Sequence, residues 1–239
     1  MRFIRFHGLT AAALLGGAFT AAPAATGESR PAVVELFTSE GCSSCPPAEA
    51  YVGELVRRRG GLALTYHVDY WDDLGWRDRF GLPEAVRRQR NYARTLRLSS
   101  VYTPQVVIDG QGDFVGSDRV SIDRALTRNR SGVAVALAVR DGEVLVDLGM
   151  QADAAPSDVV LVAYQRSAVS PIGRGENAGR TLNEFNVVRE FHTLGRWDGH
   201  IARYRSRVDA LPRGSTDVAV LVQPVGQAPI IGAATVSLQ

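Results

Sequence analysis

The amino-acid sequence predicts an α/β domain followed by a β-rich, sandwich-like domain. Over residues 31–130, short β-branched runs alternate with stretches of helical periodicity, which is typical of an α/β layer. After Gly132 the apolar side chains instead recur at every second position, the period of half-buried strands. A pair of cysteines, Cys42 and Cys45, lies where the first predicted strand meets the first predicted helix. We therefore predict one domain over residues 31–130 and a second over residues 132–239.

The first predicted domain alternates strands with helices. Proline is tolerated in the first turn of a helix, so Pro46 and Pro83 are predicted to begin the first two helices. The predicted elements, in order, are a strand at 32–37, a helix from Pro46, a strand at 62–68, a helix from Pro83, a hairpin of 106–108 and 114–115, and a helix at 120–126.

The second predicted domain contains many short strands and little helix. Its strand-like runs are 133–139, 144–148, 159–164, 185–192, 201–208, 218–222 and 230–236. Such runs with turn signals between them are typical of a β-sandwich.

The first 24 residues have the layout of a secretory signal peptide. Arg2 and Arg5 give a positive start, residues 9–19 form a short apolar run, and Ala22 and Ala24 fit a small-residue cleavage site. The run is too short to span a bilayer, so we expect an exported protein, periplasmic or secreted, with no stable membrane insertion after the signal is removed. In those compartments thiols are readily oxidised.

Composition and charge exclude several classes of protein. Two cysteines in 239 residues exclude a disulfide-stapled mini-protein and any four-thiolate metal site. The formal net charge of +2 falls to 0 when Arg2 and Arg5 leave with the signal peptide, so we expect no nucleic-acid partner. The arginines of the second predicted helix are accordingly interpreted as a solvated face; they are Arg87, Arg88, Arg90, Arg94 and Arg97.

The cysteine pair is the strongest candidate for a site. A thiol at a helix N-terminus meets unpaired backbone N–H groups and the positive end of the helix dipole, both of which favour the thiolate. A second thiol one helical turn further on can resolve a mixed disulfide. We therefore expect Cys42 to be the exposed nucleophile and Cys45 the buried resolving thiol.

Other interpretations of the pair stay open. A static structural disulfide fits an exported protein, although closing so short a loop removes little conformational entropy and therefore adds little stability. A metal centre needs further ligands, and no third ligand is identifiable beside the two thiols. A chance C-x-x-C is weak evidence by itself, but its place at a strand-to-helix turn strengthens the redox interpretation.

The segments VVELFTSEGCSSCPPAE and YTPQVVIDG resemble the thioredoxin fold. The resemblance implies that Thr103 and Pro104 form a cis-proline loop opposite the cysteines, in which Thr103 offers backbone hydrogen bonds to a substrate chain. It also implies a buried acid on the strand that leads to the cysteines. Glu35 lies on that strand, although the connection to Cys42 is one residue longer than in thioredoxins. A solvated strand glutamate is the alternative interpretation of Glu35.

A more specific resemblance covers nearly all of the predicted mature chain. The segments HVDYWDDLGWRDRF, RRQRNYA, VYTPQ and GENAGRTLNEFNVVRE are similar to those of domain-of-unknown-function family 1223, a family of exported bacterial proteins. This resemblance implies a thioredoxin-like domain followed by a β-rich domain. It implies no particular substrate.

Two further segments are candidates for a supporting role. Polar and aromatic residues follow the second predicted strand, where sites of α/β sheets are usually found; they are His67, Asp69, Tyr70, Trp71, Asp72 and Trp76. Of these, His67 and Asp69 are the candidates for handling protons, while loop packing is the simpler explanation of the others. The glycine-rich residues 173–181 are long enough to pack near the cysteines.

The sequence therefore predicts thiol–disulfide exchange with the thiols or disulfides of other proteins. In this hypothesis Cys42 attacks, Cys45 releases the product, Thr103 and Pro104 hold the partner chain, and no dissolved cofactor or metal is required. The alternative is a non-enzymatic binding protein with a static Cys42–Cys45 disulfide, because a fold by itself does not determine function.

Overall fold

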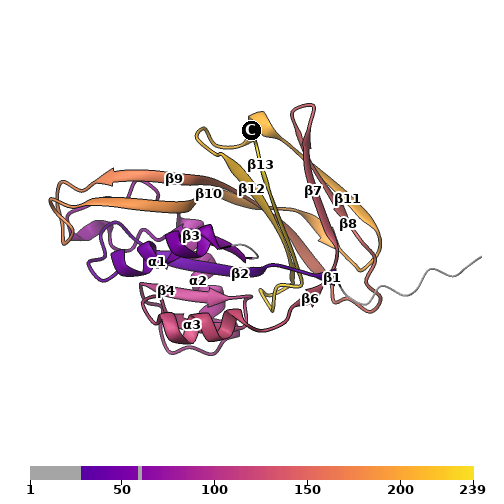
Figure 1. Ribbon diagram of the computed structural model, residues 1–239, viewed down its shortest axis with the longest axis horizontal. Helices are drawn as coiled ribbons and strands as arrows, with labels where there is room; N and C mark the ends of the chain where they lie inside the picture. The colour runs from indigo at the N-terminus through magenta and orange to yellow at the C-terminus, as the bar shows by residue number, and fades with distance from the viewer. Residues whose placement is uncertain (1–27, 59–60) are drawn as a thin grey trace, which may run out of the picture.

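The computed structural model describes residues 28–58 and 61–239 (Figure 1). The predicted signal peptide, residues 1–24, lies outside the described residues, and its export function stays a prediction. Within the described residues no helix combines the length and the apolar composition needed to cross a membrane.

The first half of the chain forms its elements close to the predicted positions. They are β1 (Glu28–Ser29), β2 (Ala32–Thr38), α1 (Pro46–Arg57), β3 (Gly61–His67), the 3₁₀ helix η1 (Asp72–Leu74), α2 (Pro83–Thr95), β4 (Gln105–Ile108), β5 (Gly112–Val115) and α3 (Arg119–Leu126). Both predicted proline starts are confirmed, since Pro46 and Pro83 are the first residues of α1 and α2.

The second half is built from strands. They are β6 (Ser131–Gly132), β7 (Val135–Arg140), β8 (Glu143–Leu148), β9 (Ser157–Pro171), β10 (Thr181–Trp197), β11 (Ala202–Arg207), β12 (Asp217–Pro224) and β13 (Gly232–Ser237), with the 3₁₀ helix η2 (Val208–Ala210) after β11. β9 and β10, at 15 and 17 residues, are much longer than the runs predicted for them.

The strands form one large sheet and two small ones. Over the part of the chain that the structure describes, the large sheet has eight strands in the order β13-β12-β9-β10-β3-β2-β4-β5, and a three-stranded sheet has the order β11-β8-β7. The two halves of the chain join where β10 runs parallel to β3, with Val187 opposite Thr65. β1 and β6 pair separately.

The predicted fold class, an α/β thioredoxin-like domain followed by a β-rich, sandwich-like domain, is therefore wrong. The protein is mostly β, and the described ranges contain only three α-helices. Strands from both predicted ranges share one mixed sheet, because β10 pairs with β3 on one side and with β9 on the other. Periodicity identifies strands but does not say which strands pair, so the continuous sheet could not be read from the sequence. The division at Gly132 stays a prediction.

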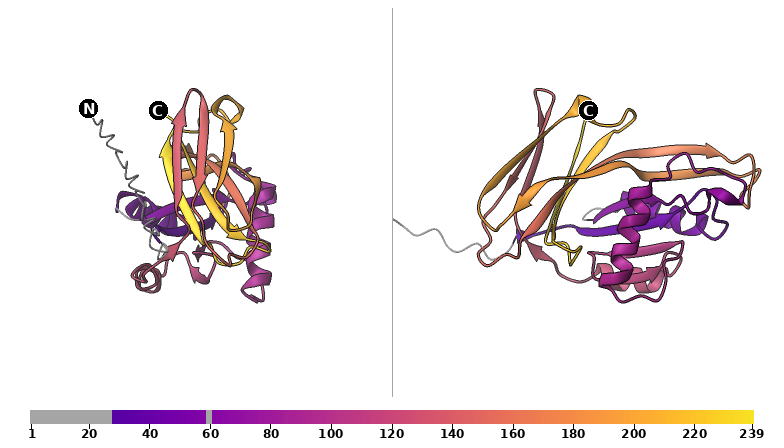
Figure 2. Two further views of the ribbon diagram at one scale, coloured as in Figure 1. Left: turned by 90° about the vertical axis from the view of Figure 1, so that its right-hand side faces the viewer. Right: turned by 180° about the vertical axis from the view of Figure 1, so that it is seen from behind.

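The helices cover both faces of the sheet near β2 and β3. α1 and α3 pack on the face that presents Val34 and Leu36, and α2 packs on the face that presents Val33 and Phe37. α1 and α3 lie in front of the sheet in Figure 1, and α2 is seen in the reverse view of Figure 2. The three-stranded sheet packs on the far part of the large sheet, where Trp197 is almost completely buried.

The alternation of side chains along the strands positions the candidate site. On β2, Thr38 shares the α1 face with Val34 and Leu36, and in register it lies beside His67 of the parallel strand β3. Both residues end their strands, and the chain that follows β2 leads directly to the cysteines. The carboxyl ends of β2 and β3 thus bring polar side chains beneath the start of α1.

Candidate functional site

Cys42 and Cys45 form a disulfide at the start of α1, with their Cα atoms 5.4 Å apart. Cys45 is the N-cap residue of the helix, and its carbonyl oxygen accepts hydrogen bonds from the backbone N–H groups of Ala48 at 2.9 Å and Glu49 at 3.2 Å. The Cys45 side chain makes no capping hydrogen bond. The sulfur atoms therefore lie at the positive end of the helix dipole, as the sequence predicts.

Neither cysteine is exposed. Cys42 and Cys45 both have 0% of their surface accessible, whereas Ser43 and Ser44 between them are exposed. The expectation of an exposed Cys42 is therefore wrong for this oxidised form. The reason is that later parts of the chain cover residues 39–45, the segment between β2 and α1 that is called the cysteine loop below. Local sequence patterns do not reveal this covering.

The glycine-rich segment between β9 and β10 packs on the cysteine loop, which confirms the expected position of this segment. The Asn177 side-chain amide donates to the carbonyl oxygens of Glu40 at 2.9 Å and Cys42 at 3.0 Å. The Glu176 carboxyl accepts a hydrogen bond from the Ser43 N–H at 3.2 Å. Residues 135 positions apart in the sequence thus make direct contact.

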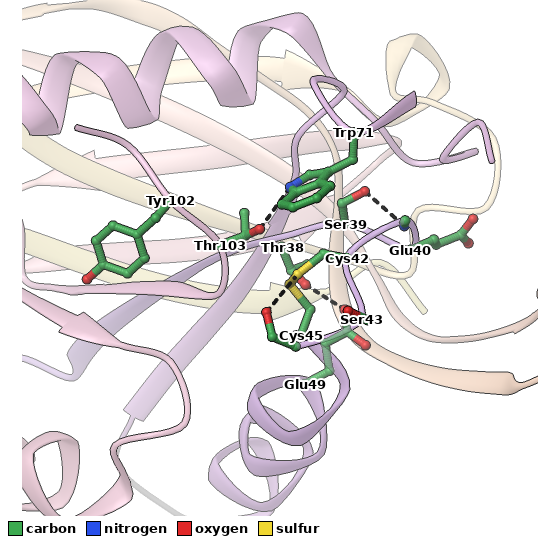
Figure 3. Close-up of a disulfide and its surroundings, with 12 residues drawn as sticks. Thr38, Ser39, Glu40, Cys42, Ser43, Cys45, Glu49, Trp71, Tyr102 and Thr103 are labelled. Atoms are coloured by element: carbon green, nitrogen blue, oxygen red, sulfur yellow. Dashed lines mark hydrogen bonds between the residues drawn. A yellow bond between two sulfur atoms is a disulfide. The ribbon is translucent and has the colours of Figure 1, made fainter. Parts of the chain in front are cut away.

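Trp71 lies on another side of the disulfide. Its indole N–H donates to the Thr103 hydroxyl at 2.9 Å, and a Cβ atom added at Gly41 would lie 3.2 Å from the Cβ of Trp71 (Figure 3). The Thr103–Pro104 peptide bond is cis. A Cβ atom added at Gly116 would lie 2.9 Å from the Cβ atoms of both Pro104 and Ala48, so Gly116 lies between Pro104 and the first turn of α1. The structure thus brings Thr103 and Pro104 close to the cysteines, and their role in holding a substrate stays a prediction.

Glu35 faces away from the disulfide. It lies between Val34 and Leu36 on β2 and points to the α2 face, where the Arg88 Nε donates to its carboxylate at 2.6 Å and the Tyr92 hydroxyl donates as well. Arg88 is only 6% exposed, so the interpretation of the arginine-rich helix as a solvated face is wrong for this residue. The buried Glu35–Arg88 pair joins α2 to the sheet.

Glu49 is the buried acid on the cysteine side, and sequence reasoning missed it. It lies four residues after Cys45 on α1, so the two side chains share one face of the helix, and the Glu49 side chain leans back toward Cys45. Thr38 donates its hydroxyl to Glu49 at 2.6 Å, and both groups lie beside the disulfide in Figure 3. The spacing Cys-x-x-x-Glu was the signal in the sequence.

Burial controls the ionisation of Glu49. Loss of solvation, reinforced by the nearby Glu184 carboxyl group, raises the pKa of Glu49 from 4.5 to about 8. The Glu49 carboxyl group is therefore mostly neutral at pH 7. It can hold a proton within the interior of the site, beside a sulfur atom that gains one on reduction.

His67 lies at the centre of a buried cluster behind Thr38 and Glu49. Its Nδ1 is 2.8 Å from Asp78 Oδ2, and its Nε2 is 3.5 Å from Glu184 Oε2, with all three side chains fully buried. Burial by itself lowers the pKa of His67, but the charge and hydrogen bond of Asp78 and the charge of Glu184 outweigh it and raise the pKa well above its ordinary value. His67 is thus an imidazolium between two carboxyl groups.

Asp78 connects this cluster to the cysteine loop. Its Oδ2 accepts from the Glu40 N–H at 2.7 Å as well as facing His67, and its Oδ1 accepts from the Phe80 N–H at 2.8 Å. Burial raises the pKa of Asp78, but the positive His67 and these hydrogen bonds hold it below the ordinary value. Asp69 is half-buried beside Gly81 and stands apart from the cluster.

Of the residues at this site, the sequence thus identified Cys42, Cys45 and His67. The structure adds four that the sequence did not predict: Glu49, Asp78, Asn177 and Glu184. In the described ranges, no group of three or more His, Cys, Asp or Glu side chains has the arrangement of a metal site.

Fold and site together define a mostly β protein with a C-x-x-C disulfide buried at a helix N-terminus, above a cluster of carboxyl groups and one histidine. Residues 33–223 match the family described as protein of unknown function (DUF1223), and the chain belongs to this family. No curated protein matches the chain.

A solved structure is similar over most of the chain. It is the X-ray structure of a protein from Agrobacterium tumefaciens, a structural genomics target, with 29% sequence identity and a TM-score of 0.74. The similarity covers 87% of this chain and 95% of that one.

Proposed function

We propose that the protein exchanges disulfides with the thiols of other proteins through Cys42 and Cys45. The observation that carries the proposal is the disulfide at the N-terminus of α1, with the neutral Glu49 carboxyl group one helical turn away. The helix dipole stabilises the thiolate form of sulfur at this position. A neutral acid beside the pair supplies the proton that the second sulfur needs.

In the oxidised form, the reaction begins with the thiolate of a partner dithiol. It attacks the Cys42 sulfur, the Cys42–Cys45 bond breaks, and the Cys45 sulfur leaves and takes the proton held by Glu49. The second partner thiol then attacks the mixed disulfide and releases Cys42. Two electrons pass from the partner to the pair, and the two protons that the partner thiols lose go to Cys42 and back to Glu49. The reverse sequence reduces a partner disulfide.

We propose that this exchange takes place outside the cytoplasm, in the periplasm or after secretion. The predicted signal peptide supports this location, and structural or catalytic disulfides persist in those compartments.

One observation favours the alternative function, a binding protein with a static disulfide: both cysteines are completely buried. Equilibration in glutathione buffers separates the two functions. The protein is incubated at a series of GSH to GSSG ratios until no further change occurs, then alkylated with iodoacetamide and weighed by mass spectrometry. We expect a reversible two-electron transition between the disulfide and dithiol forms. A disulfide that persists at every ratio in the folded protein supports the binding protein instead.

Trapping identifies the attacking sulfur and the partner. In the Cys45→Ser variant, Cys42 has no resolving thiol, so a mixed disulfide with a partner protein accumulates and is recovered on non-reducing gels. The matched control is Cys42→Ser, which retains only the cysteine at the start of the helix and is expected to trap at least tenfold less. Equal trapping by the two variants contradicts the assigned order of attack.

A further inference from the structure

We propose that residues 172–180, between β9 and β10, form a gate over Cys42 that must open before the disulfide reacts. This inference rests on the proposed exchange function and specifies its regulation. The segment is referred to below as the gate. Its contacts with the cysteine loop are the Asn177 hydrogen bonds to Glu40 and Cys42 and the Glu176 hydrogen bond from Ser43.

In the closed form a reactant has no route to the Cys42 sulfur atom. A thiolate must reach the sulfur atom that it attacks, and Cys42 is 0% exposed. Ser43 and Ser44 are exposed, so the chain around the disulfide reaches the surface while the disulfide does not. Asn177 is also 0% exposed and bonds directly to the Cys42 carbonyl group. Some covering segment has to move, and the gate is hydrogen-bonded to the backbone beside the Cys42 sulfur, at the Cys42 carbonyl group and the Ser43 N–H.

The gate is weakly held. Apart from Ile172 at its base, only Asn177 of the gate is buried, and the other residues are exposed. The gate rests on Trp76 through Gly173 and Gly175, which contribute no side chains of their own to packing. A segment with few buried apolar contacts opens at a low free-energy cost compared with the rest of a fold.

The gate has a hydrogen-bonded base about which it can move. The Ile172 N–H donates to the Arg180 carbonyl oxygen at 2.9 Å, and the Gly179 N–H donates to the Ile172 carbonyl oxygen at 2.8 Å. Ile172 itself is buried. Below this base β9 and β10 are paired from Thr181 opposite Pro171 to Trp197 opposite Ser157, with two register shifts, both beyond Val188 and so far from the gate. The tip can therefore lift without separating the strands.

The test measures the rate at which dithiothreitol reduces the Cys42–Cys45 disulfide, followed by iodoacetamide quenching and mass spectrometry. Asn177→Ala removes both hydrogen bonds to the cysteine loop and is expected to raise the rate about 5- to 150-fold, as two hydrogen bonds of ordinary net strength imply. The matched control is Arg174→Ala in the same loop. The Arg174 side chain is exposed, and within the described residues it makes no hydrogen bond or ion pair, so its rate should equal that of the unmodified protein.

The outcomes separate the gate from the proposed function. Measurable and equal rates in all three proteins overturn the gate and leave the exchange function intact. A disulfide that resists dithiothreitol in every folded variant overturns both.

Hydrogen exchange on the unmodified protein tests the same opening without a substitution. The Ser43, Ala178 and Arg180 amides are expected to exchange at least tenfold faster than those in the centre of β10, because the gate opens while the sheet stays intact. Protection equal to that of β10 overturns the gate.

Discussion

Replacement of Glu49 by glutamine tests the ionisation of the site. Glu49→Gln keeps an acceptor oxygen for the Thr38 hydroxyl but is neutral at every pH. In the native protein the pKa of Glu49 is raised from its ordinary value of 4.5 to about 8, so the folded state holds its proton more tightly than the unfolded chain does. Stability is therefore expected to fall as the pH rises between these two values.

The expected change in the free energy of unfolding with pH follows from the single proton that Glu49 holds in the folded state and loses in the unfolded chain. Between about pH 5 and pH 8, Glu49 lowers the free energy of unfolding by up to about 1.4 kcal/mol for each pH unit. The neighbouring groups add a pH dependence that the native protein and the variant share. The raised pKa of His67 gives stability that is complete below about pH 6.5 and is lost as the pH rises from there through the raised value, and the lowered pKa of Asp78 gives stability that is lost only as the pH falls below about 4.

Urea unfolding of the oxidised protein at pH 5, 6, 7 and 8 provides the measurement. Glu49→Gln is expected to gain stability relative to the unmodified protein as the pH rises through this series. The control is Glu54→Gln on the same helix, since Glu54 is partly exposed and pairs with Arg119, and its effect should stay within about 1 kcal/mol at every pH. If the difference between Glu49→Gln and the unmodified protein is the same at pH 5 and pH 8, the reasoning about Glu49 is refuted.

Two other substitutions test the packing that supports the site. Arg88→Met leaves the fully buried Glu35 without its cation and is expected to lower the free energy of unfolding by about 3–5 kcal/mol, a loss that urea titration measures; a loss below 1 kcal/mol contradicts the assigned pair. Gly132→Ala places a Cβ atom 1.9 Å from the Ile231 carbonyl oxygen and is expected to lower the free energy of unfolding by at least about 2 kcal/mol. In the control, Gly61→Ala, the added Cβ atom meets only a carbonyl oxygen at 3.8 Å, so the stability should be unchanged. Equal melting temperatures of the two variants contradict this prediction.

The sequence predicts local structure well and the assembly of the sheet poorly. Proline positions, turn residues and apolar periodicity predict β2, α1, β3 and α2 because each depends on neighbours in the chain. The place of β10 depends on a parallel contact of Val187 with Thr65, and no local pattern specifies it. A partial signal did exist: residues 159–164 are apolar without alternation, which is typical of a strand covered on both faces, and β9 is such a strand.

The same distinction holds for the site. Cys42, Cys45 and the helix N-terminus follow from a few adjacent residues and were predicted from the sequence. The choice between Glu35 and Glu49 depends on which face of β2 the helix α1 covers, and strand alternation alone does not decide that. Asp78 and Glu184 reach His67 from a loop and from β10, so their contribution becomes visible only when the tertiary structure is known.

The β9–β10 hairpin affects both the access of a partner thiol to Cys42 and the charge around His67. Two different parts of the hairpin do so. Asn177 at its tip contacts the Cys42 carbonyl group, while Glu184 on β10 faces His67 beneath the disulfide. The strand is fixed just beyond Glu184, because the Thr65 hydroxyl donates to the Phe185 carbonyl oxygen at 2.7 Å and Val187 pairs with β3. Opening of residues 172–180 therefore leaves Glu184 and His67 in place. A partner thiol that reaches Cys42 then finds Glu184 and His67 in the same arrangement as in the closed form.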